Sequence, residues 1–379
     1  MGNYGMRPVM SINSENGQWI DFSWTSGSMQ GFRTSMLNYV SNSESLAHLR
    51  TFSLFLVFEG QDGLDCSWNA SRGLAKFIAS QEILQAIDDE SSFNPNAIKE
   101  LLTRSIMKYD VELKKIIEFP NLGSTISGVL ITPDNFYIIN LGNSKVILCR
   151  DQKAYFQTLN HDLKIKNERD RILEAGGRIS SNFINGRLSV TRSLGNFDMK
   201  QSKLLSQGSQ IISAEPEITI IPRMRNSDDF IIIATNGINK VLSNDDLVNF
   251  VCQRIPVKNS IGDVCNEVIN YCLHKKSIEN LTLTIVHFDQ SKIQKDEERV
   301  RRENVLVEGM KRQIKQHFMK MEFPQSFRDT KKCVDQIIDE NDFLSSCRMT
   351  TGLFPDLKRS MMMSEISRLR EDKEISNTN

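Results

Sequence analysis

The chain has 379 residues, of which 39% are hydrophobic and 25% are charged, and this is enough for one large domain with an appendage. The 47 lysines and arginines balance the 47 aspartates and glutamates, so no net field attracts the chain to nucleic acid or to an anionic membrane. No apolar run approaches the roughly 20 residues of a membrane span, and the N-terminus lacks the apolar core of a signal peptide.

Residues 1–21 are predicted to form a flexible N-terminal tail. The stretch 3–18 has little periodicity and several turn-forming residues. Gly2 stands where a myristoyl group is attached, but Met6 occupies the position at which serine or threonine is wanted. We therefore favour a disordered tail over a membrane anchor attached through Gly2.

Residues 22–289 mix short apolar strands with amphipathic helices and show no internal repeat, which indicates one α+β domain. In its first half we expect a buried strand, two helices with a 3.6-residue apolar period, and antiparallel strands around a Pro-Asp-Asn turn. These elements cover residues 52–60, 68–89, 96–116 and 124–150, with the turn at 133–135.

The second half of this domain is predicted from turn residues. A helix over residues 167–177 should end at Gly176 and Gly177, and Asn185-Gly186 should close a hairpin between residues 178–184 and 187–193. The hydrophobic run from Phe230 should lead into a tight turn at Asn236-Gly237, and residues 281–288 should form the last strand.

From residue 290 to residue 379 the chain is charged, rich in methionine and poor in strand patterns, which predicts a helical C-terminal extension. A long helix is expected over residues 295–321, and shorter helices over residues 329–338 and 356–370. The long helix has an apolar stripe, which indicates packing against a core rather than a groove for a partner. The stripe consists of Val300, Leu306, Met310, Ile314 and Phe318.

The seven cysteines are odd in number, widely scattered and contain no C-x-x-C pair. This usage is typical of a reducing compartment. We therefore expect a cytoplasmic protein and leave the nucleus open as a further location.

Nine segments, in order along nearly the whole chain, carry a resemblance to a known family. They read GSMQGFRTSM, FLVFEGQDG, GSTISGVLIT, INLGNSKVILCR, ERDRILEAGG, NGRLSVTRSLGNFDMK, EPEI, IIIATNGINKVLSNDDL and ENLTLTIV. Together they resemble the type 2C (PPM-type) metal-dependent Ser/Thr protein phosphatases, especially the alpha and beta isoforms with a helical C-terminal extension. The resemblance implies two packed antiparallel β-sheets flanked by helices, with two Mg²⁺ or Mn²⁺ ions at one end.

The residues that should hold those metals are mostly replaced in this chain. Hard cations need several anionic oxygen ligands, yet only two of eight acidic family positions keep a carboxylate. The eight positions are Leu37, Asn38, Glu59, Asn143, Asn196, Asn236, Lys240 and Glu279. The metal ligands that remain as candidates are Glu59, Gly60 and Glu279, so we expect no metal cofactor, with a weakly held Mn²⁺ or Mg²⁺ as the alternative.

Two further positions bear on catalysis. Gln61 replaces the histidine that the resemblance assigns as general acid, and an amide cannot donate that proton. Arg33 matches the phosphate-contacting arginine, and a guanidinium can bind phosphate with two hydrogen bonds. The alternative for Arg33 is an ion pair at the rim of the site, with Glu59 as its partner.

The leading hypothesis is a catalytically inactive pseudophosphatase that acts as a binding or regulatory module for phosphoproteins or signalling proteins. The alternative is a weakly active Mn²⁺- or Mg²⁺-dependent Ser/Thr phosphatase, and a third possibility is competition with active relatives for phosphoproteins through Arg33. We further expect the ammonium of Lys240 to replace the missing metal charge by pairing with Glu59 or Glu279, with Asn236 donating hydrogen bonds to both.

Overall fold

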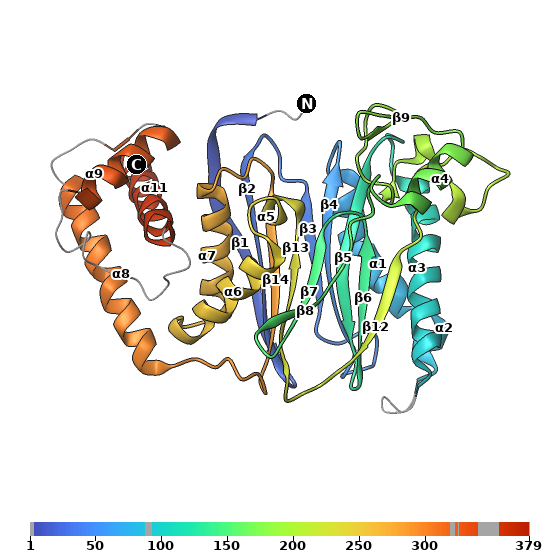
Figure 1. Ribbon diagram of the computed structural model, residues 1–379, viewed down its shortest axis with the longest axis horizontal. Coiled ribbons are helices and arrows are strands. Elements are labelled where there is room, and N and C mark those ends of the chain that lie inside the picture. The colour runs from blue at the N-terminus through green and yellow to red at the C-terminus, as the bar shows by residue number, and fades with distance from the viewer. Residues whose placement is uncertain (1–3, 88–92, 319–322, 325, 340–355, 379) are drawn as a thin grey trace.

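Two antiparallel sheets pack face to face in the computed structural model, and helices cover both outer faces (Figure 1). The structure describes residues 4–87, 93–318, 323–324, 326–339 and 356–378. The first sheet runs, in spatial order, through β1 (Tyr4–Trp19), β2 (Phe22–Arg33), β14 (Leu281–Phe288), β13 (Asp228–Ala234), β7 (Lys145–Arg150) and β8 (Lys153–Gln157).

The second sheet and the small strands complete the β structure. The second sheet consists, in spatial order, of β12 (Glu217–Pro222), β6 (Asn135–Leu141), β5 (Gly123–Ile131), β4 (Ser53–Gln61) and β3 (Asn38–Ser43). The two-residue strands are β9 (Ile179–Ser180), β10 (Phe183–Ile184) and β11 (Leu194–Gly195). The predicted fold of two packed antiparallel sheets is confirmed.

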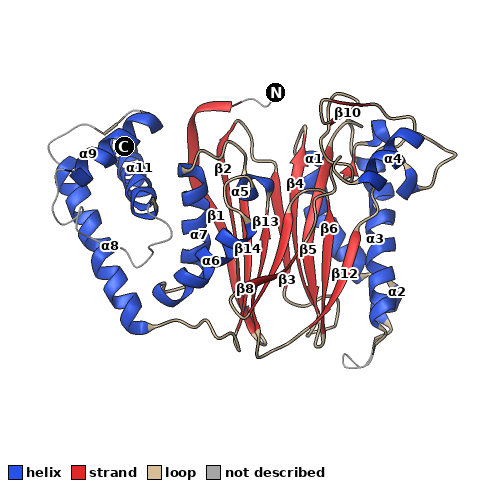
Figure 2. Cartoon of the chain, viewed as in Figure 1, coloured by secondary structure: helices blue, strands red, loops and turns tan. Residues whose placement is uncertain are grey.

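Helices separate into distinct groups around the sandwich (Figure 2). The second sheet is covered by α1 (Asp65–Ala79), α2 (Glu82–Gln85) and α3 (Pro95–Ile116), and the first sheet by α6 (Asn244–Arg254) and α7 (Ile261–His274). Two short helices, α4 (Lys166–Glu174) and α5 (Asn236–Asn239), lie near strand ends, and the C-terminal extension contains α8 (Glu297–Phe318), α9 (Phe327–Asp339) and α11 (Leu357–Thr378).

The central strands of the sandwich are buried on both faces. In β4, Leu54, Leu56 and Phe58 pack against the helices of the second sheet, while Phe55 and Val57 face the other sheet. Successive side chains of a strand point to opposite faces, so one continuous apolar run supplies both the core between the sheets and the core under the helices.

The prediction of a flexible tail over residues 1–21 is wrong, because residues 4–19 form β1. This strand pairs antiparallel with β2, and the register runs to Trp19 opposite Phe22. None of its described side chains is fully buried. An edge strand is held by backbone hydrogen bonds rather than by burial, so it leaves little hydrophobic pattern in the sequence. Gly2 lies outside the described residues.

Two predicted turns also differ from the structure. Asn236 and Gly237 do not form a tight turn but begin α5, in which the Ile238 and Asn239 amides donate to the carbonyl of Thr235. Gly237 is needed for close approach, since a Cβ there would lie 2.3 Å from the carbonyl oxygen of Asn280.

The turn predicted at Asn185-Gly186 is present, but the two strands predicted on either side of it do not pair with each other. Both residues have positive φ, as such a turn requires. Nearby, β9 pairs with β10 instead. The turn itself is flanked only by an isolated bridge between Ile184 and Leu188.

The C-terminal extension packs on the helices of the first sheet. Leu357 belongs to the apolar cluster beneath α6 and α7, and the ring of Phe327 lies 5.4 Å from that of Phe32. Four members of the predicted apolar stripe of α8 are buried and Leu306 is half-buried, which confirms their role in packing. Among the described residues no helix has the length and apolar character needed to cross a membrane.

Candidate functional site

The predicted site residues come from strand ends at one edge of the sandwich. Arg33 ends β2, Glu59 lies near the end of β4, Asn236 begins α5 directly after β13, and Glu279 precedes β14. These ends meet at the upper edge in Figure 1, because neighbouring antiparallel strands of both sheets turn there. We call this edge the sheet-end centre and define it by Arg33, Glu59, Lys240 and Glu279.

Glu59 is held by protein donors. The Ser144 hydroxyl donates to Glu59 Oε2 at 2.7 Å, and the backbone amide of Asn236 donates to the same oxygen at 3.1 Å. Burial raises the pKa of Glu59, the two hydrogen bonds oppose this shift, and the charge of Glu279 adds to it. A carboxyl with a raised pKa is a poorer ligand for a divalent cation.

Glu279 has both carboxylate oxygens engaged by cations. Arg33 binds Oε2 through Nε at 2.9 Å and also through Nη2, and Lys240 Nζ lies 3.0 Å from Oε1. Burial raises the pKa of Glu279, but the bonds to Arg33 and Lys240 outweigh it, so the pKa lies below its ordinary value. The anionic form of Glu279 is therefore favoured by its two partners, a guanidinium and an ammonium.

Arg33 is occupied as well. Its side chain is 26% exposed, pairs with Glu279, and lies 5.0 Å from the ring centroid of Tyr4 on β1. The alternative considered for Arg33, an ion pair at the rim of the site, is present, but its partner is Glu279 and not Glu59. A phosphate could reach the guanidinium only in competition with this carboxylate.

The structure supports the pairing predicted for Lys240 and corrects the role of Asn236. Lys240 follows α5 and pairs with Glu279, not with Glu59. Asn236 contributes through its backbone amide to Glu59 alone, because α5 points that amide at the end of β4. Its side chain is not needed for the contact.

We expect Lys240→Met to lower the free energy of unfolding by less than about 1 kcal/mol. The Lys240 side chain is 56% exposed, so water screens its ion pair, and Arg33 remains on Glu279. Urea unfolding at pH 7 measures this effect, with Lys292→Met as the matched control for an ion pair of 57% exposure. A loss above about 2 kcal/mol would show that Glu279 depends on Lys240 despite the exposure.

Gln61 and Asn196 bind each other. Asn196 is fully buried with φ of 49°, and its Nδ2 donates to Gln61 Oε1 at 2.8 Å and to Ser193 Oγ at 2.8 Å. Its Oδ1 is buried without a partner among the described residues. A Cβ on Gly123 would collide with Asn196 Nδ2, so this glycine leaves room for the amide pair.

The remaining degenerate positions have structural contacts. Asn38 is buried opposite Glu59 and donates to the Thr282 hydroxyl at 3.2 Å. The Leu37 amide donates to Asn280 Oδ1 at 2.9 Å, and the Leu37 carbonyl accepts from Gly60. These bonds join β3, β4 and β14 where an acidic pair would otherwise lie.

Asn143 lines a cavity of about 400 Å³ together with Asn160 and Asp162, and none of the other degenerate positions lines this cavity. Its neighbour Ser144 is the residue that reaches Glu59. Sequence reasoning missed Ser144, since serine beside a glycine-asparagine turn carries no chemical signal.

The residues of the sheet-end centre do not fit a pair of divalent cations. Two carboxylates face two cationic side chains, and three of the four carboxylate oxygens already accept hydrogen bonds from protein groups. Mg²⁺ and Mn²⁺ sites need several unoccupied oxygen ligands of net negative charge. No cluster of three or more His, Cys, Asp or Glu residues suited to a metal occurs in the described ranges.

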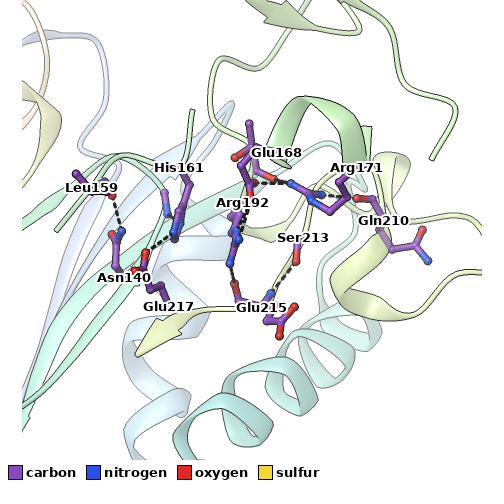
Figure 3. A network of polar contacts seen from close by, with 12 residues as sticks. Asn140, Leu159, His161, Glu168, Arg171, Arg192, Gln210, Ser213, Glu215 and Glu217 are labelled. Carbon is purple, nitrogen blue, oxygen red and sulfur yellow. Dashed lines mark hydrogen bonds and ion pairs between the residues drawn. The ribbon is translucent and has the colours of Figure 1, made fainter. Parts of the chain in front are cut away.

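A second polar network, which sequence reasoning also missed, ties α4 to the sheets (Figure 3). Glu168 is buried and accepts from Arg171 Nη2 at 2.6 Å and from Arg192 Nε at 3.0 Å and Nη2 at 2.6 Å. Arg192 also donates to the carbonyl of Glu215. The network fixes α4 to the segment from residue 191 to residue 215.

His161 holds the loop that contains Gly142 and Asn143. The amide of Gly142 donates to His161 Nδ1 at 3.1 Å, so Nδ1 must be the acceptor and Nε2 carries the proton. Nε2 lies 3.2 Å from Glu217 Oε2 and can donate to it (Figure 3). This arrangement holds Gly142, whose φ of +124° only glycine adopts readily, next to Asn143.

This chain is similar in sequence and in fold to known proteins. The model "Protein phosphatase 2C" matches residues 22–281. Protein phosphatase 1A of Bos taurus is 33% identical over 300 residues, 76% of each chain, and Protein phosphatase 1B of Mus musculus is 30% identical over 328 residues, 84% of each. A solved serine-threonine phosphatase 2C from Toxoplasma gondii has the same fold, with a TM-score of 0.60 at 17% identity over 73% of this chain and 99% of that one. The chain belongs to the protein phosphatase 2C family.

Proposed function

We propose that this protein keeps the phosphatase 2C fold without its hydrolytic chemistry and acts as a binding or regulatory module for phosphoproteins or signalling proteins. The observation that carries the proposal is the saturation of Glu279 by Arg33 and Lys240. In this family a metal-activated water is the nucleophile, and metal ions supply the charge that lowers its pKa. Here an internal ammonium and guanidinium take up the carboxylate that such ions would need.

The general acid is replaced as well. The amide oxygen of Gln61 accepts from Asn196, and an amide has no proton to transfer to a leaving group at neutral pH. Hydrolysis would thus lack both its nucleophile and its acid. The preserved sheets, loops and glycine turns support a role that depends on surface shape rather than on turnover.

We expect no release of phosphate from a phosphopeptide in the presence of Mn²⁺ or Mg²⁺, and no increase in melting temperature with millimolar Mn²⁺. A ligand that binds only the folded state stabilises it by mass action, so bound Mn²⁺ would raise the melting temperature by several degrees. Phosphate release and differential scanning fluorimetry, with and without EDTA, measure the two effects. An active phosphatase 2C in the same buffers is the positive control.

The matched variant is Asn236→Asp combined with Lys240→Asp, which removes the internal ammonium and restores two carboxylates. This variant should gain a saturable Mn²⁺-dependent stabilisation. Turnover by the unaltered chain that disappears in Glu59→Ala would contradict the proposal and favour a weakly active metal-dependent phosphatase. A saturable Mn²⁺ shift that needs both Glu59 and Glu279 would contradict the absence of a metal.

A further inference from the structure

Two cavities lie beside the sheet-end centre, at the junction with the C-terminal extension. The larger, of about 490 Å³, runs from Lys240 to the end of α7. The smaller, of about 130 Å³, lies between α7, α9 and α11. Both are lined by Tyr271, Lys275 and Lys276, so these residues form the wall that the two cavities share.

The two cavities have an excess of positive charge. Five cationic side chains and three carboxylates line them, and each carboxylate is already engaged: Glu279 by Arg33 and Lys240, Asp246 by Ser243, and Asp356 by Lys275. Lys276 and Lys331 have no ion-pair partner within the part of the chain that the structure describes. The site therefore holds two cations that an anion could neutralise.

Lys276 stands where a lysine is costly for the backbone. The amide of Lys276 donates to the carbonyl of Leu273, and that of Ser277 to the carbonyl of Cys272, which is the Schellman arrangement at the end of α7. The residue in this position adopts a left-handed conformation, and Lys276 has φ of +71°. Glycine is the usual residue there, so the backbone conformation does not explain why a lysine occupies this position.

His274 provides an independent sign of a ligand. Its Nε2 is buried without a hydrogen-bond partner among the described residues, and the side chain lines the smaller cavity. The other nitrogen, Nδ1, lies 2.6 Å from the Ser360 hydroxyl. When Ser360 donates to Nδ1, the neutral ring carries its proton on Nε2, which then needs an acceptor. Burial lowers the pKa of His274 to about 3, so the ring is neutral.

We propose that the two cavities form a binding site for a phosphorylated peptide segment, with the phosphoryl group at Lys276, Lys331 and His274 in the wall of the smaller cavity. A phosphate monoester supplies the two charges and the acceptor oxygens that these groups lack. The larger cavity falls within the size range of ligand sites and has apolar walls at Leu242 and Ile278. It can thus hold the side chains that flank a phosphorylated residue.

This inference deepens the proposed function, on which it rests. It assigns phosphoprotein binding to cavities at the end of α7 that share only Lys240 and Glu279 with the sheet-end centre, so phosphopeptide binding can be measured whether or not the chain hydrolyses phosphoesters. Loss of peptide binding and gain of turnover are separate measurements, and either can fail alone.

The test uses the full chain and a fluorescent peptide library with one fixed phosphoserine, together with its unphosphorylated twin. Anisotropy should show saturable binding of the phosphorylated library only. Lys276→Asn should weaken binding by about tenfold or more, since a charge-assisted hydrogen bond is lost. Asparagine tolerates the left-handed conformation, so the helix end should be preserved. The matched control Lys108→Gln, on α3 across the molecule, should leave the affinity unchanged.

A second measurement follows His274 in the unaltered protein. Its ring resonances should shift when the phosphorylated library is added and stay in place with the unphosphorylated one. Equal binding of both libraries, no binding of either, or an affinity insensitive to Lys276→Asn would overturn the proposal. Binding of phosphatidylserine vesicles instead of peptide, if abolished by Lys276→Asn, would assign the site to a lipid headgroup and overturn it as well.

Discussion

Replacing Arg254 with methionine is expected to lower the free energy of unfolding by about 3–5 kcal/mol, the usual cost of removing one partner from a buried ion pair. Arg254 on α6 is fully buried. Its Nε lies 2.7 Å from Glu267 on α7, and its Nη2 contacts Glu303 on α8. Without the guanidinium, Glu267 and Glu303 would lose the arginine that they share, and the ammonium of Lys258 would remain 2.5 Å from Glu267 and 4.0 Å from Glu303.

Urea unfolding of the full chain measures this loss. The matched control is Arg302→Met, which removes an exposed pair with Glu298 on the same helix and should change stability by no more than about 0.5 kcal/mol. Equal effects of the two substitutions would show that the buried cluster does not hold α8 to the domain. Because Glu303 comes from the extension, we also expect α8 to exchange its amide hydrogens faster in Arg254→Met.

Glu168→Gln is the second substitution with a large expected effect. It should destabilise the protein at neutral pH by about 3 kcal/mol, because it leaves Arg171 and Arg192 without their shared anion. Burial raises the pKa of Glu168, but the hydrogen bonds and charges of the two arginines outweigh it and lower the pKa to about 2. The side chain is only 4% exposed, so water screens these contacts little.

The pH dependence gives this prediction a specific form. A carboxyl whose pKa is lower in the folded state stabilises the protein fully above its unfolded pKa of 4.5, and this contribution is lost as the pH falls toward 2. The difference between the unaltered protein and Glu168→Gln should therefore narrow by about 1 kcal/mol between pH 6 and pH 3.5. A difference that stays constant over this range would contradict the role assigned to the charge. Glu174→Gln, on the exposed face of α4, is the control.

The sandwich was predictable because its central strands are buried on both faces. β4 contains a continuous apolar run, and β5 and β14 are rich in β-branched and other apolar residues with serine and threonine between them, and both patterns indicate strands. β1 was missed because pairing at an edge depends on backbone groups that every residue carries. The short helix at Asn236 was missed for a related reason. It begins with backbone hydrogen bonds from Ile238 and Asn239 to the carbonyl of Thr235, and these do not depend on the type of side chain.

The chemistry of the sheet-end centre was predictable in part. The replacement of acidic residues is visible in the sequence, because the surrounding glycines and apolar residues still mark each motif. The partners were not predictable, since Arg33 and Glu279 are 246 positions apart and Glu59 was an equally suitable acceptor by type. Only the spatial order of the strands, which places β14 beside β2, decides between the two carboxylates.

The position of β14 also sets the order in which the sandwich can assemble. This strand is the last of the domain, yet it pairs with β2 on one side and β13 on the other. The hydroxyls of Ser26 and Thr284, 258 positions apart, meet across that pairing. Contacts of such long sequence separation form slowly because a large loop must close first. During synthesis, β2 and β13 thus stay open along one edge until residue 288 has emerged, and a chain that stops earlier presents two strand edges with unpaired backbone N–H and C=O groups to its neighbours.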